Sequence, residues 1–179
     1  MKCRNRRRLF DLLTRSPELL DHVERGVSLI SLAGWSQDYE IVEWMLQHDA
    51  NPDLAEEGGN TLLIHAAVEN DVRLARLLLD SGAEIEKANG HYETPLGFAC
   101  AYDAVDVARL LCERGADVNG TEGWGHSYLF GVQCEKQPAI ESILLSHGAR
   151  VIHQEPKLAS DSDGNVVDRS APRSDGGGQ

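Results

Sequence analysis

The sequence predicts an all-α solenoid of stacked helix-turn-helix units, and three features of the chain support this fold class. Residues 94–119, TPLGFACAYDAVDVARLLCERGADVN, form a pattern that recurs on both sides at an interval of 33 residues. The register holds without insertions, so that Gly82, Gly115 and Gly148 align. Within a unit, leucines recur at helical spacing. A fixed period of this length is typical of a repeat array in which each unit buries its apolar face on its neighbours.

The composition is that of an acidic globular protein. The chain has 179 residues and a formal net charge of −12, and its length suits one domain. No apolar run reaches the length needed to span a bilayer. The chain begins with a basic head, but Asp11, Arg15 and Glu18 interrupt the apolar core that a signal peptide needs. We therefore expect a cytoplasmic protein.

The negative charge is concentrated in the repeats. Residues 26–152 carry seven Lys and Arg against twenty Asp and Glu. Such a field repels nucleic acids and anionic membranes, so we expect neither as a partner, and it would attract a basic protein. Alternatively, the acidity serves only solubility.

The four cysteines are scattered, without a CxxC motif or the paired spacing of a metal site. Cys100 and Cys112 occupy positions that sister units fill with Ala67 and Leu79, so we expect them to be small buried residues. Cys134 falls on a position expected to be exposed. We expect no disulfide, no metal and no cofactor.

Residues 1–26 are predicted to form an N-terminal helical cap. The pattern is helical over residues 5–25, with a break where Ser16 would be an N-cap and Pro17 the first helical residue. We expect the outer face of the cap to be solvated and to shield the first unit. Its basic side chains are Arg4, Arg6, Arg7 and Arg8. A nuclear-import signal is the alternative interpretation of this cluster.

Residues 61–86 show how one unit is built. Thr61 is a candidate N-cap of a short first helix. Asn70 follows where the chain must turn, and Asn tolerates a left-handed backbone. Asp71 then begins the second helix, which Gly82 ends with a left-handed cap.

These motifs resemble the ankyrin repeat. The resemblance is carried by the TPL triplet, a pair of small residues, a double Leu and a terminal GADVN, at residues 94–96, 99–100, 110–111 and 115–119. It implies hairpin-like loops between the helix pairs, a concave surface made by hairpin tips and first helices, and a function in binding proteins. The implied organisation is an ankyrin domain over residues 27–152, with repeats at about 27–55, 56–88, 89–121 and 122–152. Residues 153–179 are rich in Ser, Asp and Gly and are predicted to be a disordered tail.

Some positions depart from the pattern. Asp49 stands where the other units have the capping Gly, and Asp accepts a left-handed backbone at some cost. Tyr128 replaces the Pro of the TPL triplet. Gln133 replaces a small residue, and its bulk and polarity would obstruct a further unit, so we expect the array to end there.

The resemblance implies that partner-facing residues lie just before the TPL triplet and after the small pair. These positions hold two of the three Trp and two of the four Tyr. Aromatic residues beside acids are typical of a protein interface, although Trp35 and Trp124 could instead pack on neighbouring units. The candidate partner-binding residues are Trp35, Glu57, Asn60, Glu69, His91, Tyr92, Glu93, Tyr102, Glu122, Trp124, His126 and Glu135.

His65 is the unusual histidine. We expect its counterparts in the register to be Leu32, Phe98 and Val132, an apolar column that should face the core between helices. A polar ring there needs a hydrogen-bond partner. A satisfied core histidine is the favoured interpretation, and a site residue is the alternative. Trp44 aligns with leucines and is also expected in the core.

The leading functional hypothesis is a non-enzymatic module, monomeric when free, that binds a basic protein through an acidic and aromatic concave face. It could act as a stoichiometric inhibitor, such as an immunity protein that neutralises a toxin. The alternative is a regulatory adaptor that holds a second partner through the basic cap. A small hydrolase using His65 or His126 is a minor alternative, because the chain has no HExxH, GxSxG or phosphate-binding glycine loop.

Overall fold

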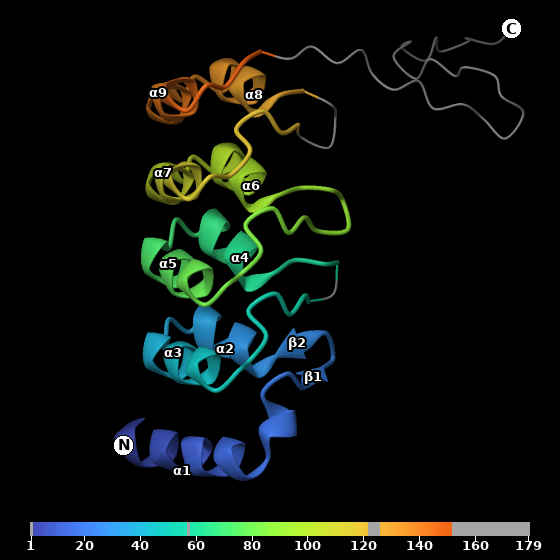
Figure 1. The fold of residues 1–179 in the computed structure, drawn as a ribbon, viewed down its shortest axis with the longest axis vertical. Helices are drawn as coiled ribbons and strands as arrows, with labels where there is room; N and C mark the ends of the chain where they lie inside the picture. Colours follow the sequence, from blue (N-terminus) through green and yellow to red (C-terminus); the bar gives the residue numbers. More distant parts are fainter. Residues whose placement is uncertain (1, 57, 122–125, 152–179) are drawn as a thin grey trace, which may run out of the picture.

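The computed structural model describes residues 2–56, 58–121 and 126–151, with the side chains of residues 2–5 left out (Figure 1). The predicted disordered tail, residues 153–179, lies outside the described residues. In chain order the elements are α1 (Lys2–Arg15), the 3-10 helix η1 (Pro17–Leu19), β1 (Val23–Glu24), β2 (Val27–Ser28), α2 (Leu29–Trp35), α3 (Tyr39–Gln47), α4 (Leu62–Val68), α5 (Val72–Asp80), α6 (Pro95–Ala101), α7 (Val105–Glu113), α8 (Tyr128–Cys134) and α9 (Pro138–Ser146).

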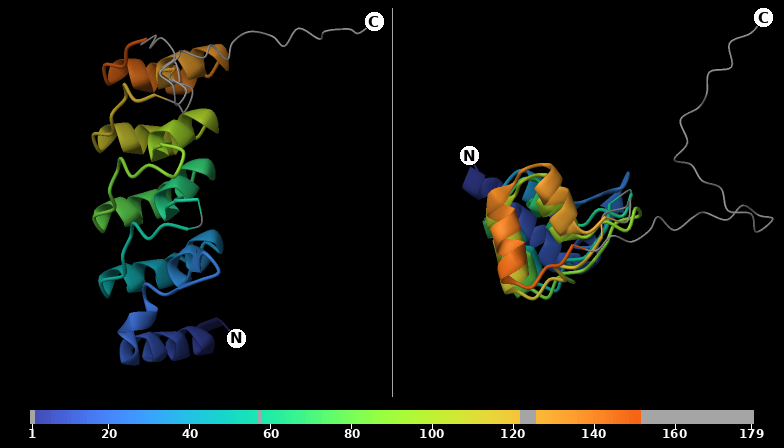
Figure 2. Two further views of the ribbon diagram at one scale, coloured as in Figure 1. Left: turned by 90° about the vertical axis from the view of Figure 1, so that its right-hand side faces the viewer. Right: turned by 90° about the horizontal axis from the view of Figure 1, so that it is seen from above.

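The helices from α2 onward are arranged in two parallel columns. The first helices of the units, α2, α4, α6 and α8, form one column, and the second helices, α3, α5, α7 and α9, form the other (Figure 1). Seen from above, the units lie over one another and their loops project to one side (Figure 2). The predicted all-α repeat fold is confirmed.

Each first helix begins with the same hydrogen bond. A hydroxyl oxygen at the N-cap accepts from the backbone N–H three residues later, which satisfies one of the free donors of the helix end. The capping residues recur at the 33-residue interval: Ser28, Thr61, Thr94 and Ser127. The N-cap predicted at Thr61 is therefore confirmed.

The turn between the two helices of a unit uses a left-handed residue. Asn70 has a φ of 51°, as predicted, and the equivalent Gln37, Asp103 and Lys136 have φ values of 55°, 53° and 57°. After the second helix, Asp49 adopts a φ of 66° where the other units have glycine. Left-handed backbone costs a non-glycine residue free energy, so these turns persist because the surrounding units fix them.

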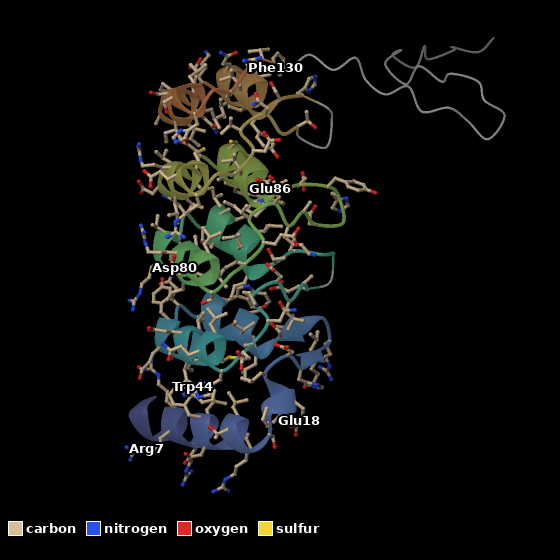
Figure 3. The ribbon with its side chains drawn as sticks, viewed as in Figure 1. Arg7, Glu18, Trp44, Asp80, Glu86 and Phe130 are labelled. Carbon is tan, nitrogen blue, oxygen red and sulfur yellow. The ribbon has the colours of Figure 1, made fainter. Side chains whose placement is uncertain are left out.

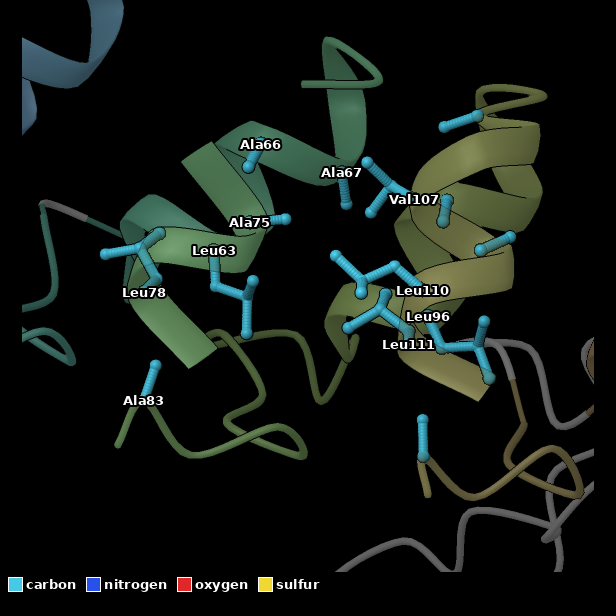
Figure 4. Close-up of a cluster of buried hydrophobic side chains, with 14 of the residues drawn as sticks. Leu63, Ala66, Ala67, Ala75, Leu78, Ala83, Leu96, Val107, Leu110 and Leu111 are labelled. Atoms are coloured by element: carbon cyan, nitrogen blue, oxygen red, sulfur yellow. The ribbon is translucent and has the colours of Figure 1, made fainter. Parts of the chain in front are cut away.

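The core lies at the interfaces between units. Leu63 and Ala67 of the second unit face Leu96, Val107 and Leu110 of the third, and all five are buried (Figure 4). Alanine lets first helices approach closely, while each fully buried leucine contributes about 1.5–3 kcal/mol. Stability is therefore distributed over the interfaces along the array.

The cysteines occupy the predicted environments. Cys100 and Cys112 are buried and Cys134 is exposed. Burial raises the pKa of the Cys112 thiol to about 11. Since the thiolate is the reactive form, Cys112 is unreactive at neutral pH.

The prediction of helix through residue 25 is wrong. Helix α1 ends at Arg15, and Pro17 begins only the single 3-10 turn η1, in which Ser16 makes no side-chain capping bond. Strands β1 and β2 then form a short antiparallel hairpin. Arg25 and Gly26 lie in its two-residue turn with φ values of 53° and 76°. Positive φ at both central residues matches the twist of paired strands, so the chain turns back instead of continuing as a helix.

The cap docks on the first unit through aromatic stacking and ion pairs. Phe10 stacks on Trp44 at 4.7 Å between ring centroids, and Trp44 stacks on His48 at 3.8 Å. Trp44 is thus half-buried between α1 and α3, close to its predicted core position (Figure 3). Arg6 pairs with Asp38 at 2.8 Å and also with Glu40. The expectation that Arg6 belongs to the solvated outer face is therefore wrong, because two acids of the first unit draw it inward.

Side chains of one loop hold the next loop. In each case a carboxylate or amide oxygen accepts from a backbone N–H about one unit further along the chain, which leaves that donor satisfied. The bonds run from the N–H of Asn51 to Asp21 (2.8 Å), of Glu84 to Asp53 (3.0 Å), of Asp117 to Glu86 (2.8 Å) and of Arg150 to Asn119 (2.9 Å). We call this set the loop ladder. Two of the acids in the loops, Asp53 and Glu86, are therefore structural.

Tyr128 and Gln133, the departures in the fourth unit, have distinct structural roles. The ring of Tyr128 is 1% exposed and lies where Gly97 and Gly120 leave room for it. Its hydroxyl hydrogen-bonds to Thr94 at 2.8 Å. Gln133 is exposed and donates to Glu141 at 2.9 Å on the outer side of this unit. The side chain of Tyr128 thus joins the fourth unit to the third.

Asn70 supplies the cap that α7 lacks. Its side-chain oxygen accepts from the backbone N–H of Val107 at 3.0 Å and of Asp106 at 3.2 Å, while the residue before α7 is Ala104. We expect Asn70→Gly to unfold at lower urea concentration than Lys136→Gly. In both variants glycine removes the strain of a non-glycine residue in the left-handed conformation. Only Asn70→Gly also loses these hydrogen bonds, which should lower its free energy of unfolding by about 1–2 kcal/mol relative to Lys136→Gly. Equal stability of the two variants would exclude the capping role.

Tyr128 is predicted to make stability fall at alkaline pH. Burial raises its pKa from 10.0 to about 12. The unfolded chain therefore loses this proton first, and the stabilisation present below about pH 10 is lost as the pH rises towards about 12. Urea midpoints should fall less steeply over this range in Tyr128→Phe than in the parent protein. The control is Tyr92→Phe, because the ring of Tyr92 is 85% exposed, and its urea midpoint should fall with pH as steeply as that of the parent protein. If the midpoint of Tyr128→Phe also falls as steeply as that of the parent, Tyr128 is not the group responsible.

Candidate functional site

One surface of the array is formed by the first helices and the loops that precede them, and we call it the first-helix face. The first helices α2, α4, α6 and α8 contain no Lys or Arg. Several large apolar or aromatic side chains are at least partly exposed on them. They include Leu32, Trp35, Val68, Phe98 and Phe130. This face is therefore apolar along the helices, and its cations are confined to the loops.

A cavity on this face, which we call the aromatic pocket, lies between α6 and α8. Its volume is about 550 Å³. The loops before the two helices also contribute, so that the pocket belongs to the third and fourth units. Five ring-bearing residues line it, Phe98, Tyr102, His126, Tyr128 and Phe130, together with the two acids Glu93 and Glu135.

Pairs of rings form the sides of the aromatic pocket. Phe98 and Tyr102 of the third unit are stacked at 6.1 Å with an interplanar angle of 22°. His126 and Phe130 of the fourth unit are 4.9 Å apart. Tyr102 is 58% exposed, so that a bound group could cover much of its ring. Phe130 lies on α8 near the loop side of the array (Figure 3).

A glycine helps to open this pocket. Gly131, and not the neighbouring Val132 as expected, occupies the position in the register that Leu32, His65 and Phe98 fill in the other units. Without a side chain at that point, the ring of Phe98 has no counterpart on α8. The missing side chain at residue 131 therefore adds to the space beside Phe98.

A second, smaller hollow lies at the other end of this face. It has a volume of about 230 Å³ and is formed by α1, β2 and α2 with the turn around η1. Its lining is almost entirely apolar, with Leu12 and Leu32 each 52% exposed. We call it the leucine hollow.

The prediction that His65 lies in the core is wrong. Its ring is half-buried and lies 6.0 Å from that of Trp35, at an angle of 55°. Its counterpart Leu32 is largely exposed. The buried stripe of α4 is made instead by Leu63 and Ala66 with their neighbours. Since residue 65 lies off this stripe, the whole column turns towards the first-helix face.

The structure brings four of the predicted partner-binding residues together. Glu93, Tyr102, His126 and Glu135 all line the aromatic pocket. The other described candidates are spread along the same face or its loops. Trp35 lies against His65, while Glu69, His91 and Tyr92 are exposed. Glu57, Glu122 and Trp124 lie outside the described residues.

Asn60 is engaged within the protein. Its side-chain oxygen accepts from Asn89 at 3.0 Å, and Glu93 accepts from the same amide at 3.3 Å. Asn89 is buried and its own oxygen accepts from the backbone N–H groups of His91 and Glu93. Asn60 thus joins two loops, and Asn89, which the sequence analysis did not select, shapes the loop that carries Glu93. The Asn-Gly dipeptide at residues 89–90 is a turn signal that could have indicated it.

Phe98 and Phe130 were also missed as site residues. Phe98 was expected in the core with the His65 column, and Phe130 was not among the candidate residues. Both line the aromatic pocket. Their aromatic character beside Tyr102 and His126 was the available signal.

The titratable groups of this part of the chain form no metal centre. No group of three or more His, Cys, Asp or Glu side chains able to hold a metal occurs in the regions that the structure covers. Within the same regions, no helix is both long and apolar enough to cross a membrane.

Comparison with known proteins agrees with the architecture. Residues 29–122 match the family model described as ankyrin repeats (3 copies). Among solved structures, the chain is similar to the crystal structure of an ankyrin repeat domain from Acinetobacter baumannii AYE. That likeness has a TM-score of 0.67 and 26% sequence identity, and it covers 71% of this chain and 67% of the other. Comparison with curated proteins gave no match. The chain belongs to the ankyrin-repeat family, whose arrays are protein-protein interaction modules.

Proposed function

We propose that this protein is a non-enzymatic binding module that captures a basic protein partner on its first-helix face. One observation carries the proposal: exposed rings and carboxylates gather at the aromatic pocket, on helices that contain no Lys or Arg. Rings provide area for burial, and carboxylates orient a partner of opposite charge. The resulting surface favours a partner with basic side chains around an apolar contact.

The charge of this face is not entirely available to a partner. Asp53 and Glu86 hold the loop ladder, whereas Glu69 and Glu135 are exposed at the ends of first helices. Exposed acids steer a basic protein towards the face and speed association, an effect that salt screens. Binding should therefore weaken as ionic strength rises.

The aromatic side chains supply the anchor. Tyr102 and Trp35 are partly exposed, at separate points on the face. Tyr and Trp at the centre of an interface commonly account for 2 kcal/mol or more each, about thirtyfold in affinity. A partner that covers both would span much of the array.

We favour a role as a stoichiometric inhibitor in the cytoplasm, and specifically as an immunity protein against a toxin whose active surface is basic. Seating such a surface on the first-helix face would block it sterically. The free protein would be a monomer, and its acidity disfavours nucleic acid and anionic membranes as partners.

The adaptor alternative is supported by the leucine hollow. It lies at the opposite end of the face from the aromatic pocket and adjoins α1, where Arg7 and Arg8 are exposed. A second partner could bind there. In that case Arg7→Glu would release one partner and Tyr102→Ala the other.

The hydrolase alternative has little support. His65 lies against Trp35, and His126 lies against Phe130. A catalytic histidine is usually oriented by an acid or a carbonyl, whereas these rings contact aromatic neighbours. Turnover in a substrate screen that is lost in His126→Ala would revive this alternative.

Affinity purification of the tagged protein from its own cells tests the proposal. We expect one basic protein at a one-to-one ratio, bound at least about tenfold more weakly by Tyr102→Ala because an anchor is lost. Glu135→Gln should weaken binding at low salt. The matched control is Glu113→Gln, which removes the same charge from an exposed position on α7, in the column of second helices. This variant should bind the partner as the parent protein does.

Two outcomes would overturn the proposal. One is unchanged affinity in both Tyr102→Ala and Glu135→Gln. The other is an acidic partner whose binding strengthens with salt. Circular dichroism of each variant confirms that the array remains folded.

A further inference from the structure

We propose that the aromatic pocket is an arginine site, which takes the guanidinium group of a single arginine side chain of the partner. The inference rests on the proposed function and specifies the chemistry of its anchor. It follows from the kinds of groups that line the pocket, from their positions and from the absence of a cation among them.

The lining favours a cation. Aromatic faces attract positive charge, and the pocket is lined by the rings of Phe98 and Tyr102. Glu93 reaches it from the loop before α6 and Glu135 from the end of α8. Among the residues that the structure describes, the lining contains no Lys or Arg. The two carboxylates therefore remain available to an incoming charge.

Glu135 is the better placed of the two acids. It is exposed, whereas Glu93 is half-buried and already accepts from Asn89 at 3.3 Å. Glu93 is thereby held in position and keeps acceptor capacity, because a carboxylate has about four lone-pair sites. Glu93 of the third unit is thus fixed in position, whereas Glu135 of the fourth unit can adjust to a ligand.

Arginine suits this arrangement better than lysine. A guanidinium is planar, stacks on aromatic rings and donates several N–H groups in its plane. It can therefore lie on the ring of Tyr102 while its edge donates to Glu135. An ammonium is a compact, strongly hydrated charge that cannot stack. Lysine would gain only part of the available contact.

The pocket is specific to one place in the array. Gly131 leaves space beside Phe98, and the buried ring of Tyr128 forms part of the lining. In the second unit the same two positions are His65 and Leu62. The combination of rings, acids and open space is thus confined to the third and fourth units among the regions described.

The test is a nuclear magnetic resonance titration of the full chain with Nα-acetyl-arginine amide. The citrulline analogue is the matched probe, because it has nearly the same shape without the charge. We expect the arginine probe to shift ring protons of Phe98 and Tyr102, with a dissociation constant on the order of 1 mM. The citrulline probe should bind at least about tenfold more weakly, and Nα-acetyl-lysine amide should also bind more weakly.

Matched variants locate the site. Tyr102→Ala and Glu135→Gln should each weaken binding of the arginine probe several-fold. Glu113→Gln removes a carboxylate from an exposed position on α7, outside the pocket and outside the first-helix face, and should leave binding of the probe unchanged. Equal binding of the citrulline or lysine probe, or equal binding by Tyr102→Ala, overturns the inference.

The inference and the proposed function can fail separately. If the cellular partner is captured through Tyr102 but the arginine probe does not bind, only the arginine site is wrong. If the probe binds but both Tyr102→Ala and Glu135→Gln leave capture of the partner intact, the pocket is a cation site and the proposed function fails.

Discussion

The structure depends on side chains of one unit that satisfy backbone N–H groups of the next. Short helices and long loops leave many such donors without partners, and the array meets them across the interface between units. Asp53 and Glu86 do so in the loops, and Asn70 does so at the start of α7. These bonds fix the angle and register at which leucine and alanine surfaces pack. They also hold in place the loops that carry Glu93 and His126.

The first-helix face arises from the positions that this scaffold leaves unused. The buried stripe of α4 occupies residues such as Leu63 and Ala67, so that the column through His65 is free to face outward. Substitutions in that column then change the surface without disturbing the stack. Gly131 opens the aromatic pocket, while Tyr128 compensates by linking the fourth unit to Thr94. The buried stripe and the first-helix face therefore lie on different sides of the same short helices.

The sequence predicts the repeat, its caps and its left-handed turns because these features follow from local chemistry at a fixed interval. Thr61, Asn70 and Asp49 are examples. It does not show which way a column faces, since the period groups residues 32, 65 and 98 without fixing the rotation of the helix. It also does not separate structural acids such as Glu86 from available ones such as Glu135, because that depends on contacts between units. The prediction that Arg6 faces solvent was wrong for the same reason, because its partners Asp38 and Glu40 belong to the next unit.

The most direct test of binding on the first-helix face uses a cysteine that the chain already has there. Cys134 is exposed and lines the aromatic pocket, whereas Cys100 and Cys112 are buried. We predict that the captured partner slows alkylation of Cys134 by at least about tenfold, as measured by mass spectrometry of its peptide. In the variant Glu113→Cys, alkylation at the added site on the column of second helices should keep its rate. Protection at position 113 with Cys134 still reactive would contradict the account.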